Sequence, residues 1–334
     1  MKDDKPLVSY LLLTYNQEKY IKEAVESALA QTYSPLEIII SDDCSKDKTF
    51  EIIKETVTEY KGPHKIILNR NEQNLGIAGN VNKVMAMAKG ELFVMAAGDD
   101  ISLPHRTQVL YDYWQKYKNQ VYAFTSSMKG IDTNGLPYQK SDRFFNGEPQ
   151  HLEIEDYFKK CHWCGAGSAY DRYLFDLYGP INYDFNEDRA YLTRCWLIGK
   201  TLALKEVLLK YRWGGISTKP TDTIYKLNSR WNLNCYLQLN KDLKKINKKI
   251  SKKTEIYIQN QILKYRYLYN YYKTESFFKK LLYYKNVIKI DYQEWNKYCF
   301  LPKNLRYNAY KYYRISIIII RHLLRNLNIE KLAS

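Results

Sequence analysis

The chain has 334 residues, of which 45% are hydrophobic and 26% are charged, a composition that excludes a disordered or fibrous protein. No run of about 18 apolar residues occurs, so we expect no membrane-spanning helix. The first residues lead straight into a strand-like segment that is too short for a signal peptide, and six cysteines without framework spacing fit a reducing cytosol.

The formal net charge of +16 is concentrated in the C-terminal third. Residues 221–334 contain 24 Lys and Arg against 7 Asp and Glu, whereas residues 1–220 contain 28 against 29. The same third holds 16 of the 33 tyrosines. A basic, aromatic surface can meet an anionic membrane or nucleic acid, or can simply face solvent. We expect contact with an anionic membrane surface and no nucleic acid partner.

The first hundred residues alternate between apolar runs and segments with helical periodicity. The runs of strand length are 8–13, 36–40, 65–68 and 92–97, and the helical segments between them are 18–31, 49–60 and 77–88. Strands that are apolar throughout and alternate with helices predict a parallel sheet covered on both faces. Ligands bind such sheets at the carboxyl ends of the strands, so the side chains that follow these runs are candidates for a site.

Acidic residues follow the second and fourth predicted strands. Asp42 and Asp43 come after the run 36–40, and Asp99 and Asp100 come after the run 92–97. Carboxylate oxygens suit Mg²⁺ or Mn²⁺, which proteins usually hold with one or two carboxylates and the phosphates of a substrate. The two clusters therefore indicate a site for a nucleotide and a divalent cation.

The pattern is looser after residue 101. We expect a helix over 103–118, a strand over 121–128, a turn at Asn134-Gly135, a short helix over 155–160, and a small-residue loop to residue 168. A helix over 186–198 begins with Asn186 as its cap and with Glu187 and Asp188 in its first turn. Basic helices are expected beyond Pro220.

The segments over residues 6–110 resemble the family 2 glycosyltransferases, and a fainter match continues to about residue 218. The segments that carry the resemblance are Val8-Ser9, Thr14-Tyr15-Asn16, Gln31-Thr32-Tyr33, the Asp-Asp-x-Ser-x-Asp-x-Thr run from Asp42 to Thr49, Asn74-Leu75-Gly76, Lys89-Gly90-Glu91 and Gly98-Asp99-Asp100. The resemblance implies the α/β GT-A fold, a Rossmann-like mixed and mainly parallel sheet flanked by helices. It implies a catalytic domain over 1–220, with a nucleotide-sugar half (about 1–110) and an acceptor half (about 111–220), before a basic helical extension over 221–334.

The same resemblance implies a set of donor and metal contacts. The residues that would contact the nucleotide-sugar are Thr14, Tyr15, Asn16, Asp42, Asp43, Asn74, Gly76 and Arg212. Asp99, with Asp100, would hold Mg²⁺ or Mn²⁺, although Ala97 stands where the family usually has a further acid. The alternative is that each acidic cluster is a structural turn, and that Arg212 ends a strand.

For the acceptor side, Glu187-Asp188 resembles the Glu-Asp motif of the family. Asp188 would be the base for the acceptor hydroxyl, with Glu187 orienting the acceptor. The alternative is helix capping, because acids stabilise helix N-termini. Gly165 and Gly167 fall in the acceptor-facing loop and would let a sugar approach, while Trp163 either stacks on a sugar or belongs to the core.

The resemblance thus implies an inverting glycosyltransferase that moves a sugar from a nucleotide-sugar to a lipid-linked glycan of bacterial surface polysaccharide. A UDP-sugar is the first candidate for the donor. It would work in the cytoplasm, peripheral on the inner face of the plasma membrane, and its oligomeric state is left open. An apolar run at 317–320 between basic residues either dips into the bilayer interface or packs on the catalytic domain.

Three other classes of protein would require different sequence features. A sugar-phosphate nucleotidyltransferase would carry a Gly-rich basic loop after the first strand, which Thr14-Tyr15-Asn16 does not provide. A nucleic-acid-binding protein would use the basic third and leave the acidic clusters idle. A dinucleotide-binding dehydrogenase would show Gly-x-Gly-x-x-Gly after a strand, and no such motif is present.

Overall fold

The computed structural model describes residues 5–150, 163–214 and 222–273, and residues 279, 282, 283, 286, 287 and 290 beyond them. The chain divides into two compact units. The first comprises Met1–Ile224 together with Asn234–Ile250, and the second comprises Tyr225–Leu233 and Ser251–Ser334. The expected short helix over 155–160 and the apolar run at 317–320 lie outside the described residues.

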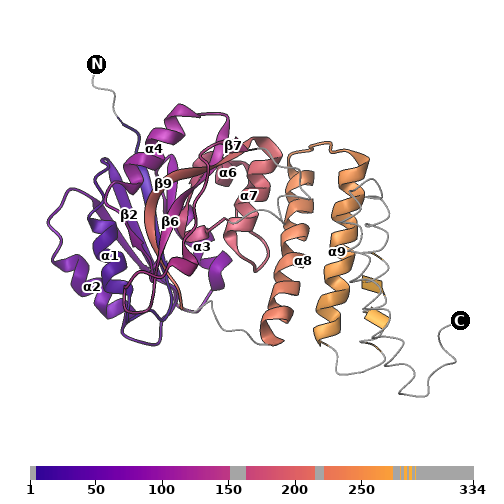
Figure 1. Cartoon of the computed structure of the whole chain (residues 1–334), viewed down its shortest axis with the longest axis horizontal. Helices are drawn as coiled ribbons and strands as arrows, with labels where there is room; N and C mark the ends of the chain where they lie inside the picture. Colours follow the sequence, from indigo (N-terminus) through magenta and orange to yellow (C-terminus); the bar gives the residue numbers. More distant parts are fainter. Residues whose placement is uncertain are drawn as a thin grey trace, which may run out of the picture. The chain divides into compact units, whose positions relative to one another are not determined.

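Within the described residues, nine strands of the first unit form one sheet (Figure 1). The strands are β1 (Val8–Thr14), β2 (Leu36–Asp42), β3 (Lys65–Arg70), β4 (Leu92–Ala97), β5 (Ile101–Ser102), β6 (Val121–Ile131), β7 (Pro149–Gln150), β8 (Ser168–Asp171) and β9 (Lys200–Arg212). Their order is β3-β2-β1-β4-β8-β6-β9-β5, with β7 paired to β9.

The N-terminal half of the sheet is parallel, as the alternation of strands and helices predicts. Strand β1 pairs in parallel with both β2 and β4, and β2 pairs in parallel with β3. Strand β8 lies antiparallel between β4 and β6, which makes the whole sheet mixed. The predicted mixed, mainly parallel sheet is confirmed, although β8 and the 13-residue strand β9 were not anticipated.

Helices cover the sheet on both faces. Those of the first unit are α1 (Ile21–Leu29), α2 (Thr49–Thr58), α3 (Gly76–Met87), α4 (Arg106–Lys116), α6 (Arg172–Tyr178) and α7 (Glu187–Ile198), with short 3₁₀ turns η1 (Gln139–Ser141) and η2 (Gly165–Gly167). From β1 the chain passes through α1 to β2 and through α2 to β3 at one edge of the sheet, and α3 then returns it to β4 beside β1. Because such crossovers are right-handed, α3 lies on the opposite face from α1 and α2.

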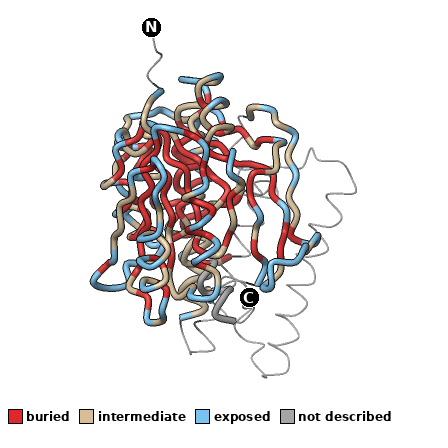
Figure 2. Tube along the Cα trace, turned by 90° about the vertical axis from the view of Figure 1, so that its left-hand side faces the viewer, coloured by how far each residue is buried: buried red, intermediate tan, exposed pale blue. Residues whose placement is uncertain are grey.

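The core follows this two-sided arrangement, and the buried trace runs through the centre of the sheet (Figure 2). Tyr10, Leu12 and Ile38 belong to one apolar cluster together with side chains of α1, α2 and α4. The alternate residues of the same strands, such as Leu11 and Ile39, are also buried but lie outside that cluster. A strand buried on both faces has no polar alternation, which is why these segments are apolar throughout.

Two further helices follow the sheet. Helix α8 (Asp222–Lys245) contributes residues 225–233 to the second unit and residues 234–245 to the first. Helix α9 (Lys252–Lys273) belongs to the second unit and carries the Lys-rich and Tyr-rich composition noted above. In the part of the chain that the structure describes, no helix combines the length and the apolarity that crossing a bilayer requires. The proposed boundary near residue 220 stays a prediction.

Candidate active site

The carboxyl ends of β2, β1 and β4 lie side by side at one edge of the sheet. The backbone N–H of Asp43 donates to the Thr14 carbonyl (2.9 Å), and the N–H of Gly98 donates to the Leu13 carbonyl (2.9 Å). The two acidic clusters therefore flank the end of β1. Ligands of open α/β sheets bind at this edge, where the order of the strands reverses direction.

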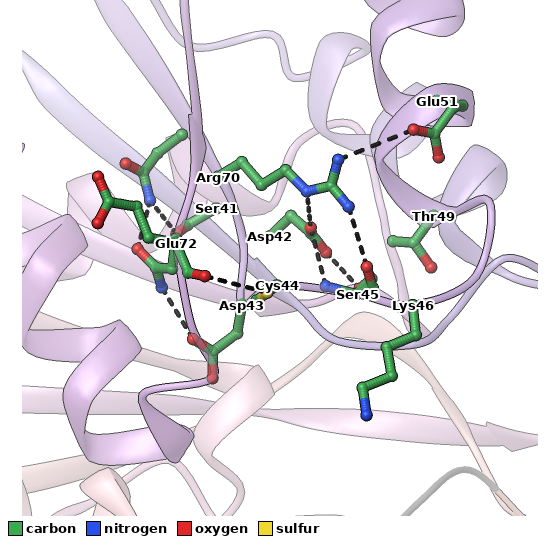
Figure 3. Close-up of polar contacts among 12 residues, drawn as sticks. Ser41, Asp42, Asp43, Cys44, Ser45, Lys46, Thr49, Glu51, Arg70 and Glu72 are labelled. Carbon is green, nitrogen blue, oxygen red and sulfur yellow. Dashed lines mark hydrogen bonds and ion pairs between the residues drawn. The ribbon is translucent and has the colours of Figure 1, made fainter.

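Asp42 is fully buried and is used to shape the loop after β2 (Figure 3). Its carboxylate accepts the Ser45 N–H (3.1 Å) and the Ser45 hydroxyl, and it pairs with Nε of Arg70 (3.3 Å). Arg70 also donates to the Ser45 carbonyl (3.0 Å). The partners of Asp42 are therefore all within the protein, which supports a structural task for this residue.

Asp43 holds the turn that precedes α3. Its carboxylate accepts hydrogen bonds from Asn71 Nδ2 (2.8 Å), the Leu75 N–H (2.9 Å) and the Gly76 N–H (2.9 Å). Gly76 has φ of +72°, a conformation that favours glycine, and its N–H also donates to Asn74 Oδ1 (3.0 Å). A carboxylate has about four acceptor positions, so one remains available for the predicted contact with a nucleotide base.

The end of β1 supplies buried polar atoms beside the glycine of the second cluster. Thr14 Oγ1 and Gln17 Oε1 are buried and have no hydrogen-bond partner among the described residues. A Cβ added at Gly98 would lie 2.8 Å from the first atom and 2.4 Å from the second. Asn16, at φ of +52°, instead locks the adjacent loop, because its Oδ1 accepts the Lys46 N–H (2.8 Å). Tyr15 is half-buried beside it.

The acids after β4 are crowded rather than paired. Asp100 is buried, and burial together with the charge of Asp99 raises its pKa well above the ordinary value, although its Oδ1 accepts the Arg212 N–H (2.8 Å). Burial also raises the pKa of Asp99, which remains partly exposed. Two neighbouring carboxylates with hard oxygen donors fit a divalent cation, which would relieve their mutual repulsion. Among the described residues no group of three or more His, Cys, Asp and Glu gathers that could hold a metal ion. A cation held by one or two carboxylates ordinarily takes its other ligands from water and substrate phosphates.

Arg212 ends β9 next to these acids and is only 4% exposed. Its guanidinium donates to the carbonyls of Asp99 (2.9 Å) and Asp132 (3.0 Å) and to the carboxylate of Glu23, and it lies over the Tyr20 ring. Three of its five N–H groups thus tie the end of β9 to the residues that follow β4 and β6 and to α1. The predicted pairing with a diphosphate stays a prediction, and the remaining two N–H groups would have to supply it.

A second pair of acids lies at the start of α7. Burial and the charge of Asp188 raise the pKa of Glu187 to about 8. Burial also raises the pKa of Asp188, against the opposing charges of Arg189 and Arg143. Asp188 Oδ1 accepts the Arg189 N–H (2.6 Å). Acids at a helix start are ordinarily stabilised in the charged form, but here burial outweighs that effect.

Asn186 occupies the expected cap position of α7, but the predicted side-chain cap is wrong. The side chain of Asn186 makes no capping hydrogen bond, and its Oδ1 is buried without a partner among the described residues. The helix therefore starts with an unused acceptor next to two acids that are raised in pKa. Arrangements of this kind are typical of sites that await a ligand.

The small-residue loop lies against both acid pairs. A Cβ at Gly165 would lie 2.1 Å from Glu187 Oε1, so only glycine lets the loop approach this closely. Burial raises the pKa of Cys164 to about 12, and the charges of Asp100 and Asp188 both add to that shift. The loop therefore meets Glu187 at Gly165, and its turn η2 also contacts β4, the strand that leads to Asp99 and Asp100.

The other predicted acceptor residues belong to the same loop. Gly167 packs against Met128 and Thr125, where an added Cβ would approach each to 3.2 Å. Trp163 is half-buried, its indole N–H has no partner in the described part of the chain, and its carbonyl accepts from Arg143. These contacts leave both uses of Trp163 open.

One residue that holds this loop was missed by the sequence analysis. Arg106 is fully buried at the start of α4 and donates to the carbonyls of Met95 (2.7 Å) and Ala166 (2.8 Å). It therefore ties the acceptor loop to β4. A cation in the first turn of a helix is electrostatically unfavourable, and that departure from the usual pattern was the available signal.

The comparisons with known proteins agree with this geometry. The sequence profile described as "Glycosyl transferase family 2" matches residues 9–179. The chain belongs to glycosyltransferase family 2. An uncharacterized glycosyltransferase of Methanocaldococcus jannaschii is 37% identical over 218 residues, which cover 63% of this chain and 71% of that protein. One from Haemophilus influenzae is 28% identical over 260 residues, covering 72% of this chain and 78% of that protein.

Solved glycosyltransferases share the fold of this family 2 protein at low identity. S. aureus TarS 1–349, in complex with UDP, superposes with a TM-score of 0.58 at 15% identity, covering 94% of this chain and 88% of that chain. The mannosyltransferase PcManGT from Pyrobaculum calidifontis, in complex with GDP-Man and Mn²⁺, gives a TM-score of 0.52 at 15% identity, covering 99% and 89%. The expected GT-A fold is thereby confirmed.

Proposed function

We propose that this family 2 enzyme is an inverting glycosyltransferase that uses a nucleotide-sugar, with a UDP-sugar as the first candidate donor. The sugar would be moved to a hydroxyl of a lipid-linked glycan in bacterial surface polysaccharide synthesis. The observation that carries the proposal is that one glycine-containing loop contacts Glu187 through Gly165 and is tied to β4, the strand that leads to Asp99 and Asp100, by the hydrogen bonds of Arg106. The acids after β4 suit the leaving diphosphate, and those at the start of α7 suit the attacking hydroxyl.

The donor would bind at the edge formed by β2, β1 and β4. The turn of residues 74–76 and the loop of residues 14–16 are held in place by Asp43, Ser45 and Lys46 before any donor arrives. Preorganised loops of this kind reduce the entropy that binding would otherwise cost. Two relatives in fold are solved in complex with UDP-GlcNAc and with GDP-Man, which supports a nucleotide-sugar donor here.

Asp99, with Asp100 behind it, would hold Mg²⁺ or Mn²⁺, a Lewis acid that neutralises charge on a departing diphosphate. The presence of Mn²⁺ in the PcManGT complex supports this choice of cation. Arg212 fixes the backbone of Asp99 through its Nε. This contact keeps Asp99 at the edge where the phosphates would lie.

Asp188 would accept the proton of the acceptor hydroxyl at Oδ2, because Oδ1 is held by the Arg189 N–H. Its partial exposure gives the acceptor a route to it. Glu187 has a pKa of about 8 and is therefore mainly protonated at neutral pH, so it can donate a hydrogen bond to the acceptor. Asp188 and Glu187 would thus take different roles, because neighbouring carboxyl groups in different surroundings commonly differ in pKa.

The acceptor and location are proposed from charge. Residues 221–334 carry 24 basic against 7 acidic residues, which suits an anionic membrane that presents a lipid-linked acceptor. In this proposal the basic extension holds the enzyme on the inner face of the plasma membrane. It is not expected to bind nucleic acid.

A donor screen tests the proposal. Purified protein is incubated with UDP-glucose, UDP-GlcNAc and GDP-mannose, with and without MnCl₂, and the release of UDP or GDP is measured. We expect slow, metal-dependent hydrolysis of one UDP-sugar, which Asp99→Ala abolishes. Release that is equal with and without metal would contradict the role of Asp99. Release from no nucleotide-sugar, with or without acceptor lipid, would contradict the proposed function.

A further inference from the structure

Three polar residues recur on one face of α8 and all reach the same loop. Asn234, Gln238 and Asp242 are spaced by four residues, so they lie one above another along the helix. All three lie beyond residues 9–179, the part that the family profile matches. The loop that they reach, residues 179–186, connects α6 to α7 and leads directly into Glu187 and Asp188.

Two of these residues contact the loop backbone directly. Asn234 Nδ2 donates to the Asp184 carbonyl (2.8 Å), and Gln238 Oε1 accepts the Asn182 N–H (2.8 Å). Gln238 is buried, and its Nε2 donates to Asp242 Oδ1 (3.0 Å). Its amide is therefore used at both ends, which fixes its orientation.

Asp242 reaches the loop through an ion pair with Arg194 of α7. The side chains of Arg194 and Asp242 are 0% and 2% exposed, and Nε lies 2.9 Å from Oδ2. The rest of the guanidinium donates to the carbonyls of Gly179 (2.8 Å) and Pro180 (3.3 Å). A buried ion pair is costly unless its remaining groups are hydrogen-bonded, and here the loop carbonyls satisfy them. Arg194 is thereby held in one orientation against the loop.

Helix α3 holds the same loop with one further side chain. Asn82 Nδ2 donates to the Ile181 carbonyl (2.8 Å), and Asn82 Oδ1 accepts the Ile181 N–H (2.8 Å). Backbone groups at residues 179, 180, 181, 182 and 184 are therefore all fixed by side chains from α3, α7 and α8. This is a dense restraint for a connecting segment, because loops ordinarily hydrogen-bond to solvent.

We propose that Gln238 and Asp242 of α8 are positioning residues for sugar transfer, because they fix loop 179–186 and thereby the start of α7 with its proposed base. The inference rests on the proposed function and adds to it a role for a helix beyond the family match. A displaced base loses rate while the donor site on β1, β2 and β4 is untouched. Loss of the positioning contacts should therefore lower kcat without lowering the affinity for the donor.

The test uses Gln238→Met, which keeps the length of the side chain and removes both of its hydrogen bonds. Lys241→Gln is the matched control, because Lys241 is exposed on the same helix. Hydrogen–deuterium exchange is measured over residues 179–188 and over β1. UDP release from the nucleotide-sugar that the wild type hydrolyses is measured on the same samples. Donor affinity is measured by calorimetry.

We expect Gln238→Met to speed exchange over residues 179–188 but not over β1, and to lower kcat by about ten- to hundredfold. Donor affinity should stay within about twofold, because the interaction lost is one that matters after binding. Asn234→Ala, which removes a single bond to the loop, should act in the same direction with a smaller loss. Lys241→Gln should change none of these quantities.

Wild-type kcat in Gln238→Met, unchanged exchange over residues 179–188, or a fall in donor affinity that matches the fall in kcat would each overturn the positioning role. Failure of the proposed function has a different signature, namely a wild-type protein that releases UDP or GDP from no nucleotide-sugar. In that case the positioning role in transfer fails as well, while the exchange data still report whether α8 restrains the loop.

Discussion

The acids that follow β2 and the acids that follow β4 look alike in the sequence but differ in the structure. Asp42 and Asp43 accept hydrogen bonds from the Ser45, Leu75 and Gly76 backbone and from the Asn71 side chain, and Asp42 forms an ion pair with Arg70. Asp100 is buried and Asp99 is half-buried, and burial raises the pKa of each despite the nearby charge of Arg212. The pKa values of Glu187 and Asp188, at the start of α7, are raised by burial in the same way.

The difference shows that the sequence pattern of two adjacent acids after a strand does not by itself say whether the acids support the fold or take part in chemistry. Carboxylates that are supplied with N–H donors stabilise the loop that surrounds them. Carboxylates that are buried with too few donors weaken the fold and are available to a cation or a proton. We therefore propose that Asp42 and Asp43 chiefly support the framework around the donor, and that the other two pairs take part in the chemistry. Substitutions in each region can break that assignment.

The largest effect is expected for Asp188→Asn. Loss of a general base costs about 10²- to 10⁴-fold in kcat, whereas donor binding should be retained because the residue lies on the acceptor side. Steady-state UDP release and calorimetric donor binding measure the two quantities. Loss of donor binding together with turnover would make Asp188 a structural acid instead.

Asp99→Asn should come next. Because it weakens cation binding, we expect at least about a hundredfold loss of hydrolysis at limiting MnCl₂, with partial recovery at high MnCl₂. A metal titration of activity measures the shift, and Asp112→Asn, an exposed acid on α4, is its control. Identical metal dependence in wild type and Asp99→Asn would remove Asp99 from the proposed cation site.

A change in the first region should instead act on stability. Asp43→Ala removes the acceptor of the Leu75 N–H and one of the two acceptors of Asn71 Nδ2 and of the Gly76 N–H. We expect this loss to cost about 3 kcal/mol of unfolding free energy. Urea unfolding measures the loss, with Glu55→Ala, an exposed acid on α2, as the control. A variant as stable as the wild type would show that these hydrogen bonds do not support the fold.

Glu187→Gln should stabilise the protein at alkaline pH. The pKa of Glu187 is raised to about 8, so between its unfolded value and pH 8 the folded state holds more protons than the unfolded state. The unfolding free energy therefore falls as pH rises through this window. Glutamine removes that loss, which is on the order of 4 kcal/mol at pH 8 and absent at pH 4. Urea unfolding of both proteins at the two pH values measures it, and a constant difference would contradict the raised pKa.

The sequence predicts the donor half of the fold well, because its signals are local. The strands β1 to β4 and the helices between them lie within about three residues of the expected ranges. Strand β9 was missed because Lys200, Lys205 and Lys210 interrupt its apolar residues, and its partner β6 lies far away in the sequence. A polar strand paired at long range leaves no periodic signal.

The candidate site was predictable in its position and less so in its electrostatics. The strand order brings Asp43 and Asp99 to one edge, as continuous apolar strands imply. The partners that separate framework acids from reactive ones, Arg70 and Asn71, come from the tertiary fold. The same holds for Gln238 and Asp242, which are polar in sequence and buried in the structure.

A single urea-unfolding experiment at pH 8 decides whether framework and reactive acids differ, with three isosteric variants: Asp43→Asn, Asp99→Asn and Asp188→Asn. We predict that Asp43→Asn unfolds at lower urea than the wild type, because an amide cannot accept all three N–H groups. Asp99→Asn and Asp188→Asn should be as stable as the wild type or more stable, because each removes a carboxylate whose charged form partial burial disfavours. Equal destabilisation by all three would contradict the division between framework and reactive acids.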